Sequence, residues 1–392
     1  MFSIQDREFM ARAIRLARKG LYTTDPNPRV GCVIVNNELV VGEGWHEFAG
    51  GPHAEVNALR VAGELARGGT AYVTLEPCSH FGKTPPCADA LIEAGVSKVI
   101  AAMQDPNPQV AGQGFERLRA AGVEVLSGLL EQEAEALNPG FVKRMRTGLP
   151  LVRIKLAMSV DGRTAMRSGE SQWITGADAR EDVQRLRARS SAIVTGSGTV
   201  LHDDPSLTVR SDSLQATGNV AGRGLRQPLR VILDSDCQMD PKAKVLTQDG
   251  ACVIATAHGA YIPDELASIE GLSVVPFSVQ ETQYGTGIDL NQLLHWLGKQ
   301  NCNEVLVEAG ARLCGQFVQQ KLVDELWVYM APVLMGSEAR PLLELPLQSM
   351  ADRLCLSLRD MRMLGSDIRM IYSPDHSGQQ AEPAQTVVAK ES

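Results

Sequence analysis

One histidine, two cysteines and a glutamate have the types and spacing of a catalytic metal centre. His53 and Glu55 are separated by one residue, and Cys78 and Cys87 follow, each directly after a proline. A catalytic zinc ion takes three protein ligands and leaves its fourth position to water, and His53, Cys78 and Cys87 supply that number. Glu55 then remains to carry protons to and from this water. The pattern predicts a zinc-dependent deaminase in the first third of the chain.

Other interpretations of these residues fit the pattern less well. A single cysteine is more often a core residue than a ligand, and a single histidine is usually part of the hydrogen-bonded structure, but their joint pattern is much rarer. A purely structural zinc site would take a fourth Cys or His ligand. His80 is a candidate for that place, although a position lining the substrate pocket suits it better. A zinc-stabilised interaction protein would have no use for Glu55.

Length and charge limit what kind of protein this is. A chain of 392 residues is expected to form about two domains. A net charge of −8 argues against general attraction to nucleic acid or to an anionic membrane. A deaminase of free bases or RNA, fused to a nucleotide-binding module, is the main alternative to an enzyme of small molecules. It predicts basic stripes and stacking aromatics in the second half, whereas only 5% of all residues are aromatic.

The N-terminal residues and the cysteines suggest a location. The first residues lack the apolar core of a signal peptide, and no apolar run approaches the roughly 18 residues of a membrane span. The eight cysteines are scattered without a dense framework. We therefore expect a cytoplasmic protein with reduced thiols and no membrane partner.

The elements expected around the metal centre alternate between strand and helix, as in a layered α/β domain. Strands are expected over 30–35, 39–41, 70–75, 98–103 and 123–126, and helices over 6–19, from 53, and over 87–94, 115–121 and 132–146. Gly42 to Pro52 is expected to be a glycine-rich loop. His53 and Cys87 then stand at helix starts, which favour thiolates. Because residues two apart do not face each other within a helix, His53 and Glu55 share a cavity only if His53 lies at the helix entry.

A second α/β alternation follows a break at 147–150. Its strands are expected over 152–158, 192–195, 230–233, 252–256, 272–276, 304–307 and 326–330, and its helices over 177–189, 290–299 and 311–319. Residues 210–227 are expected to be a mobile loop and 373–392 a disordered tail. The predicted domains are therefore 1–147, 148–372 and the tail. Two strand–glycine–helix turns, at 195–199 and 307–312, offer backbone amides to a phosphate, although each signal alone is weak.

The stretches 52–55 and 77–78 resemble the cytidine-deaminase-like superfamily. Eight residues separate Cys78 from Cys87, where two are usual, and this departure marks one branch of the superfamily. The stretches 74–80 and 84–87, together with 25–31, are similar to the deaminases of riboflavin biosynthesis. The resemblance implies that Asn27 helps hold the pyrimidine, that Glu55 is the proton shuttle, and that one Zn²⁺ is the cofactor.

The second domain resembles the reductases of the same pathway, on the stretches 155–163, 171–175, 201–210 and 307–310. The resemblance implies an N-terminal cytidine-deaminase-like α/β/α domain followed by a C-terminal dihydrofolate-reductase-like α/β domain that uses NADPH. The implied reactions are hydrolytic deamination of 2,5-diamino-6-(5-phosphoribosylamino)pyrimidin-4(3H)-one and NADPH reduction of the ribosyl chain, which gives 5-amino-6-(5-phosphoribitylamino)uracil. We also expect a homo-oligomer, either a dimer or a tetramer.

The same resemblance implies which residues form the reductase site. Those expected to contact NADPH are Ala157, Trp173, Thr199, Asp203, Ser235 and the segment Gly310, Ala311, Arg312, Leu313, Cys314, Gly315 and Gln316. Those expected to contact the phosphorylated pyrimidine substrate are Ser171, Arg187, Leu207, Arg210 and Glu308. Arg187 and Arg210 suit a phosphate monoester, although surface charge is the default reading of each. Lys155 and Asp203 are the expected proton-handling residues.

Overall fold

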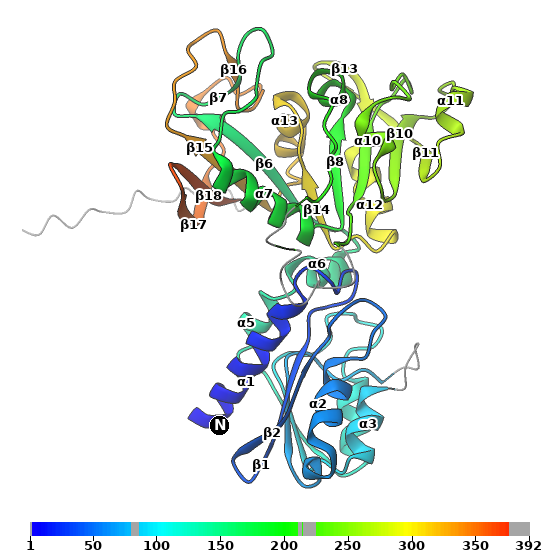
Figure 1. Cartoon of the computed structure of the whole chain (residues 1–392), viewed down its shortest axis with the longest axis vertical. Helices are drawn as coiled ribbons and strands as arrows, with labels where there is room; N and C mark the ends of the chain where they lie inside the picture. The colour runs from blue at the N-terminus through cyan, green and yellow to red at the C-terminus, as the bar shows by residue number, and fades with distance from the viewer. Residues whose placement is uncertain (1, 80–85, 211–213, 215–224, 376–392) are drawn as a thin grey trace, which may run out of the picture.

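The computed structural model describes residues 2–79, 86–210, 214 and 225–375 of the chain. Two α/β domains lie one above the other along the long axis, with the N-terminal domain below and the C-terminal domain above in Figure 1. The first contains a five-stranded sheet and the second a nine-stranded sheet. The mixed α/β architecture predicted from the sequence is confirmed.

The first sheet has the strand order β2-β1-β3-β4-β5. Strand β1 pairs antiparallel with β2 and β3, whereas β3, β4 and β5 run parallel. The strands are β1 (Gly31–Asn36), β2 (Leu39–Trp45), β3 (Thr70–Val73), β4 (Lys98–Ala101) and β5 (Glu124–Ser127). The helices are α1 (Ile4–Ala17), α2 (Ala54–Ala62), α3 (Cys87–Glu93), α4 (Gln113–Ala120), α5 (Glu131–Glu135) and α6 (Pro139–Thr147).

Helices cover both faces of this sheet, as the alternating side chains of β1 require. Cys32 and Ile34 pack into one core with α2, α3 and α4, while Val33 and Val35 pack into another with α1, α5 and α6. Successive strand residues point to opposite faces, so an uninterrupted apolar strand needs a helix layer on each side. The domain is therefore an α/β/α sandwich.

The glycine-rich loop expected from Gly42 begins later than predicted, because β2 continues to Trp45. A Cβ atom on Gly42 would lie 2.3 Å from the carbonyl oxygen of Ala58, and one on Gly44 would lie 2.4 Å from that of Ala54. The glycines thus allow α2 to lie directly against the strand. They serve close packing here and not a turn.

The second sheet has the order β11-β10-β9-β8-β14-β6-β15-β18-β17. The seven strands from β11 to β15 run parallel, and β18 and β17 are antiparallel additions at one edge. The strands are β6 (Leu151–Ser159), β8 (Ala192–Gly196), β9 (Leu229–Leu233), β10 (Cys252–Ala257), β11 (Leu272–Phe277), β14 (Glu304–Val307), β15 (Glu325–Ala331), β17 (Leu356–Leu364) and β18 (Asp367–Pro374).

Two cores again lie on the two faces of this sheet. One core includes α12 and α13, and the other includes α7, α8, α10 and α11. These helices are α7 (Ala177–Arg189), α8 (Ser197–Asp203), α10 (Lys244–Thr247), α11 (Asp264–Ala267), α12 (Leu290–Lys299) and α13 (Ala311–Gln319). Two small ribbons pair β12 (Val279–Thr282) with β13 (Gly285–Ile288), and β7 (Arg163–Ala165) with β16 (Arg340–Pro341).

The hairpin of β17 and β18 corrects the sequence interpretation, in which the last strand ended at 330 and a tail began at 373. Ser373 and Pro374 belong to β18. Strand β17 is exposed along much of its length, and its alternation of apolar and polar residues is interrupted by a register shift between Leu358 and Asp360, so the sequence shows neither a continuous apolar run nor an unbroken alternation. The rest of the expected tail, 376–392, and most of the expected loop at 210–227 lie outside the described residues.

The two domains are in direct contact through α6. A Cβ atom on Gly140 of this helix would lie 2.4 Å from the carbonyl oxygen of Asn303, so only glycine fits there. The ammonium group of Lys143 lies 2.6 Å from the carboxylate of Asp324. None of the helices among the described residues has the length and apolar character that crossing a bilayer requires.

Candidate functional site

The predicted metal ligands lie together at the starts of two helices. His53 is the N-cap of α2 and has extended backbone angles, so it stands at the helix entry, and Cys87 is the first residue of α3. The His53 Nδ1 atom is 3.2 Å from Cys87 Sγ and 3.6 Å from Cys78 Sγ. The three ligand atoms all lie within 4.8 Å of one another.

This donor set fits zinc. With Zn–S near 2.3 Å and Zn–N near 2.0 Å, tetrahedral ligand atoms lie about 3.5 Å apart, close to both His53 distances. The hydrogen bond from the Cys87 thiol, helped by His53, lowers the pKa of Cys78 to about 4 despite its burial. The thiolate at Cys78 in turn raises the pKa of Cys87. Metal binding replaces the thiol proton, and a bound cation would hold both sulfurs as thiolates.

Glu55 lies in the first turn of α2, beside these ligands but outside the donor set. Its side chain is buried, and burial is the main reason that the pKa of its carboxyl is raised to about 7. The positive charge of a metal ion at the adjacent ligands would lower this pKa again. A buried carboxyl of this kind, next to a metal-bound water, is placed to move protons.

Asn27 is linked to the metal ligands through His46, a residue that the sequence interpretation missed. The Asn27 amide nitrogen is 3.1 Å from His46 Nε2, and His46 Nδ1 is 3.0 Å from the carbonyl oxygen of Pro52. The rings of His46 and His53 pack edge to face, with their centroids 5.4 Å apart. His46 directly follows β2, in a stretch interpreted as loop. The only sequence signal was a titratable side chain shortly before the ligand stretch.

Glu76 holds the Cys78 segment against α4. Its carboxylate accepts backbone N–H groups from Asp105, Gly112 and Gly114 at 2.9–3.1 Å. A Cβ atom on Gly114 would lie only 1.9 Å from the carbonyl oxygen of Pro77, so the helix approaches the ligand segment closely. His80, the alternative fourth ligand, lies outside the described residues.

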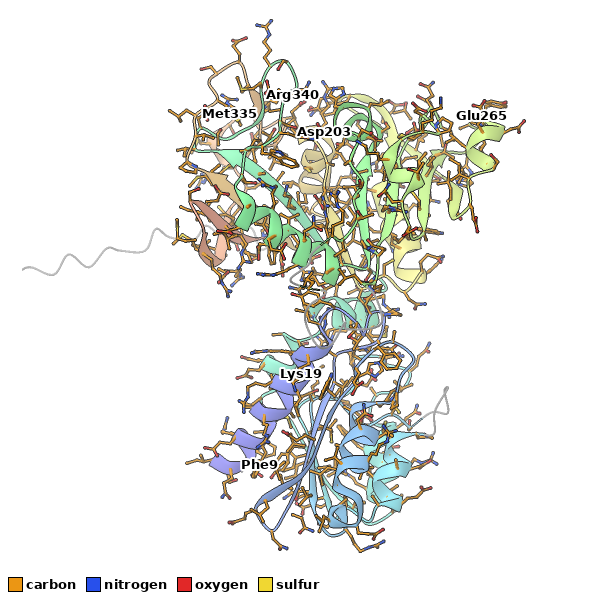
Figure 2. The ribbon with its side chains drawn as sticks, viewed as in Figure 1. Phe9, Lys19, Asp203, Glu265, Met335 and Arg340 are labelled. Atoms are coloured by element: carbon orange, nitrogen blue, oxygen red, sulfur yellow. The ribbon has the colours of Figure 1, made fainter. Side chains whose placement is uncertain are left out.

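Many of the residues expected in the reductase site follow the carboxyl ends of the parallel strands β8, β9 and β14, where open α/β sheets bind ligands. Ser171 Oγ donates to Asp203 Oδ1 at 3.2 Å. Both line a cavity of about 490 Å³ with Ser168, Gly169, Glu170, Gln172 and His202. Figure 2 shows Asp203 in the upper part of the domain, away from the first domain.

Three further predicted residues form one charged cluster. The guanidinium group of Arg187 binds both carboxylate oxygens of Glu308, at 2.6 and 2.9 Å, and donates to the carbonyl oxygen of Thr208 at 3.2 Å. Burial would raise the pKa of Glu308, but Arg187 outweighs it and lowers that pKa. Burial lowers the pKa of Lys155, an effect that Glu308 opposes. Arg187 and Glu308 therefore bind each other before any substrate arrives.

The remaining predicted contacts differ in exposure. Trp173 is 72% exposed, and the guanidinium group of Arg180 lies 4.8 Å from its ring. Arg210 is exposed, whereas Leu207 is buried. Ala157 lies on β6 and Thr199 on α8, and Ser235 follows β9, with its carbonyl oxygen accepting the backbone N–H of Ala257.

The segment 310–316 forms the start of α13, with Gly310 as its N-cap. Gly310 and Arg312 are exposed, whereas Cys314 and Gly315 are buried against the domain. A Cβ atom on Gly315 would lie 2.2 Å from the carbonyl oxygen of Glu344. Ala311, Leu313 and Gln316 are partly buried. Cofactor contact by side chains is therefore expected from the first turn of this helix and not from Cys314.

Fold and site together define a two-domain enzyme, a zinc-deaminase domain followed by a parallel-sheet reductase domain. The family model "Cytidine and deoxycytidylate deaminase zinc-binding region" matches residues 3–103, and the model "RibD C-terminal domain" matches residues 150–370. The chain belongs to the family of the riboflavin biosynthesis protein RibD.

Relatives match over almost the whole chain. The RibD protein of Escherichia coli is 51% identical over 370 residues, covering 93% of this chain and 98% of the relative. That of Haemophilus influenzae is 52% identical, covering 95% and 98%. The solved structure of Acinetobacter baumannii RibD has a TM-score of 0.87 at 46% identity, covering 95% of this chain and 99% of that one.

A second solved structure is described by its two activities. It is a diaminohydroxyphosphoribosylaminopyrimidine deaminase and 5-amino-6-(5-phosphoribosylamino)uracil reductase from Thermotoga maritima. Its TM-score with this chain is 0.80 at 31% identity, covering 95% of this chain and 99% of that one.

Proposed function

We infer that this chain catalyses two successive steps of riboflavin biosynthesis, with a zinc-dependent deaminase in residues 1–147 and an NADPH-dependent reductase in 148–372. The first step is hydrolytic deamination of 2,5-diamino-6-(5-phosphoribosylamino)pyrimidin-4(3H)-one. The second reduces the ribosyl chain to give 5-amino-6-(5-phosphoribitylamino)uracil. The observation that carries the proposal is the His53–Cys78–Cys87 cluster beside a buried Glu55 that is not needed as a ligand. A deaminase of RNA or free bases is not favoured.

In the deaminase site, His53, Cys78 and Cys87 would hold the zinc ion. When bound, this ion supplies an acidified water as the nucleophile. Glu55 accepts the proton of that water, and it returns protons to the pyrimidine ring and to the departing ammonia. Asn27 orients the pyrimidine, and His46 holds the Asn27 side chain at 3.1 Å.

In the reductase site, bound NADPH would supply a hydride for C1′ of the imine that forms when the ribosylamine ring opens. The first turn of α13 offers backbone N–H groups to the cofactor at Gly310 and Ala311. Glu308 faces the sugar hydroxyls, and Arg187 keeps its carboxylate ionised. Lys155 and Asp203 are the proposed proton-handling groups. Asp203 lines the cavity, while Lys155 lies beside Glu308.

The proposal is tested by assaying both activities of one purified preparation. The chain should contain one zinc ion, release ammonia from the diaminopyrimidine substrate, and oxidise NADPH only with the deaminated pyrimidine. A zinc chelator should stop ammonia release and leave NADPH oxidation unchanged. Ammonia release from RNA or free cytosine, with none from the phosphoribosyl substrate, would favour the alternative.

Arg210 is exposed, and its backbone N–H donates at 2.8 Å to Gln184 of α7, the helix that also contains Arg187. If its guanidinium group binds the substrate phosphate, Arg210→Ala should raise the KM for the phosphorylated pyrimidine about 10- to 100-fold, the worth of a charged hydrogen-bond pair. The Kd for NADPH, measured by fluorescence titration, should change less than about twofold. An equal weakening of both would contradict the assignment.

We also propose that the protein is a cytoplasmic homo-oligomer, either a dimer or a tetramer. All eight cysteines are free, which suits a reducing compartment. The edge strand β17 exposes Leu356, Leu358, Met361 and Met363, an apolar edge of the kind that a second chain covers. Light scattering of the purified protein measures the assembly directly, and a monomeric mass would contradict it.

A further inference from the structure

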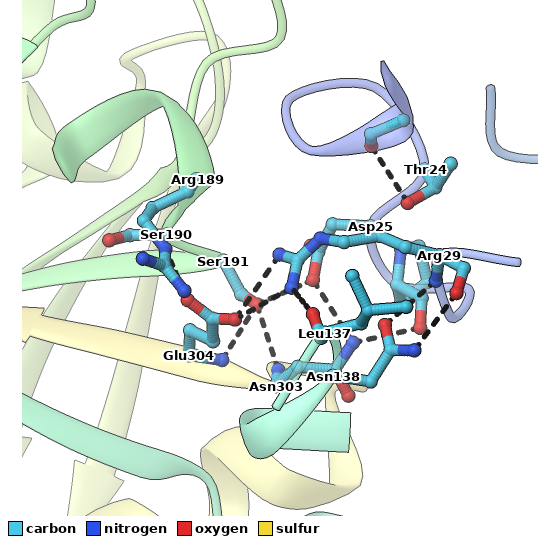
Figure 3. Close-up of polar contacts among 12 residues, drawn as sticks. Thr24, Asp25, Arg29, Leu137, Asn138, Arg189, Ser190, Ser191, Asn303 and Glu304 are labelled. Atoms are coloured by element: carbon cyan, nitrogen blue, oxygen red, sulfur yellow. Dashed lines mark hydrogen bonds and ion pairs between the residues drawn. The ribbon is translucent and has the colours of Figure 1, made fainter. Parts of the chain in front are cut away.

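A network of buried polar groups joins the two domains, and it is centred on β14 (Figure 3). Glu304 of this strand binds the guanidinium groups of Arg153 and Arg189 from its own domain and of Arg29 from the deaminase domain. Its neighbour Asn303 is buried beside it. These two residues of the reductase domain therefore lie against the segment of the deaminase domain that contains Asn27.

Asn303 holds the residues just before Asn27. Its side-chain amide donates to the carbonyl oxygen of Pro26 at 2.8 Å and to Asp25 Oδ1 at 3.1 Å. Ser191, also of the reductase domain, donates to the same Asp25 oxygen at 2.8 Å. The Asp25–Pro28 loop, which contains Asn27, is thus bound to the second domain as well as to its own domain.

The residue after this loop is fixed as well. The backbone N–H of Arg29 donates to Asn138 Oδ1 at 2.8 Å, and the Arg29 guanidinium group lies 3.2 Å from Glu304. Hydrogen bonds and an ion pair therefore hold the chain on both sides of Asn27. From there its amide reaches His46 at 3.1 Å, which in turn contacts Pro52 and the His53 ring.

Asn303 is itself rigidly held, which suits it to fix another group. Its backbone N–H donates a hydrogen bond to Ser191 Oγ at 2.8 Å, and its carbonyl oxygen accepts the N–H of Leu151 at 2.8 Å. Its side-chain oxygen accepts from Arg144 Nε at 2.7 Å. All its polar groups are paired, so its amide N–H bonds have a fixed direction.

We propose that Asn303 of the reductase domain is a positioning residue for the deaminase. It fixes the Asp25–Pro28 loop, and through it the side chain of Asn27 that orients the pyrimidine. This inference rests on the proposed function of Asn27. A binding group held by a rigid supporting shell binds without an ordering cost, and small displacements of such a group are expensive.

The test compares Asn303→Ala with the wild type in the full-length zinc-loaded enzyme. Losing the two loop contacts should raise the KM for deamination about tenfold with kcat within about threefold, because a ground-state binding group is loosened. Zinc content should stay at one per chain. NADPH oxidation on the deaminated substrate should stay within about twofold, since the reductase site lies beyond the other end of β14.

A double variant separates positioning from general damage. If Asn303 acts through Asn27, then Asn27→Ala combined with Asn303→Ala should deaminate no worse than Asn27→Ala alone. Lys143→Met is the matched control, because Lys143 joins the same two domains through its ion pair with Asp324 and takes no part in the contacts to Asp25 and Pro26 described above. Its deamination kinetics should equal those of the wild type.

The inference would be overturned by wild-type kinetics for Asn303→Ala, by additive losses in the double variant, or by an equal loss in Lys143→Met. Loss of zinc or of reductase activity in Asn303→Ala would also count against it, because the residue would then be merely structural. Failure of the proposed function is a separate outcome, since the wild-type enzyme would then release no ammonia.

Discussion

Glu55→Gln should lower the rate of ammonia release by about three orders of magnitude, which is within the range for removing a general acid–base group. The amide has nearly the volume of the carboxyl, so the buried site should stay packed, but it cannot take up and return a proton. Ammonia release is measured with saturating substrate. The variant should oxidise NADPH on the deaminated pyrimidine at the wild-type rate.

Zinc analysis separates this result from a loss of the metal. Glu55 is not one of the three ligand residues, so Glu55→Gln should retain one zinc ion per chain. Cys87→Ala is the matched comparison, because it removes a ligand and should lose both zinc and deamination. Unchanged ammonia release in Glu55→Gln would refute the proposed mechanism.

Glu304→Gln should destabilise the protein by about 3–5 kcal/mol, the usual effect of removing one partner from a buried ion pair. The carboxylate faces three guanidinium groups, and its side chain is only 2% exposed. A neutral amide would take away the carboxylate that Arg29 and Arg189 bind and leave Arg153 with Glu325 as its carboxylate partner. Urea unfolding followed by tryptophan fluorescence measures the change in the free energy of unfolding.

Glu338→Gln is the control for this experiment, because Glu338 pairs with Arg167 at the surface, where both side chains are about four-fifths exposed. A surface pair contributes about 0–1 kcal/mol, so this variant should unfold almost like the wild type. A destabilisation of Glu304→Gln no larger than that of the control would show that the buried cluster does not stabilise the folded protein.

The pH dependence of this stabilisation has a definite sign. Burial acts to raise the pKa of Glu304, but the three guanidinium groups outweigh it and hold the pKa well below 4.5. A carboxyl whose pKa is lower in the folded state contributes stability above its unfolded pKa, and that contribution is lost as the pH falls through the folded value. The difference between wild type and Glu304→Gln should therefore persist at neutral pH and shrink only in acid.

The meeting of His53, Cys78 and Cys87 was predictable from the sequence because the residues belong to short, local segments. His53 and Glu55 belong to one helix start, and Cys78 and Cys87 flank one short segment. Their spacing along the chain is then enough to predict that these four side chains lie close together. His46 shows the limit of this reasoning, since its contact with Asn27 spans 19 residues and depends on where β2 ends.

The alternation of strands and helices was also predictable, because strands buried on both faces give continuous apolar runs. The hairpin of β17 and β18 was not, because an exposed edge strand has no such run. The pairing of Arg29 with Glu304 across 275 residues could not be foreseen either. A charged residue at the start of an apolar strand signals a buried partner, but the sequence does not say which arginine it is.

The close approach of Gly140 to Asn303 has a consequence for where the chain can be divided. In the sequence, α6 is the last helix of the first domain, but in the structure it also packs against the second domain. A fragment ending at Thr147 would keep a helix face shaped for a carbonyl group that is no longer there, and a fragment starting at Gly148 would expose Glu304 and Asn303 to water. The two catalytic domains are therefore not independent units joined by a flexible linker. Replacing one of them by a foreign domain would require a redesigned domain interface as well as a linker.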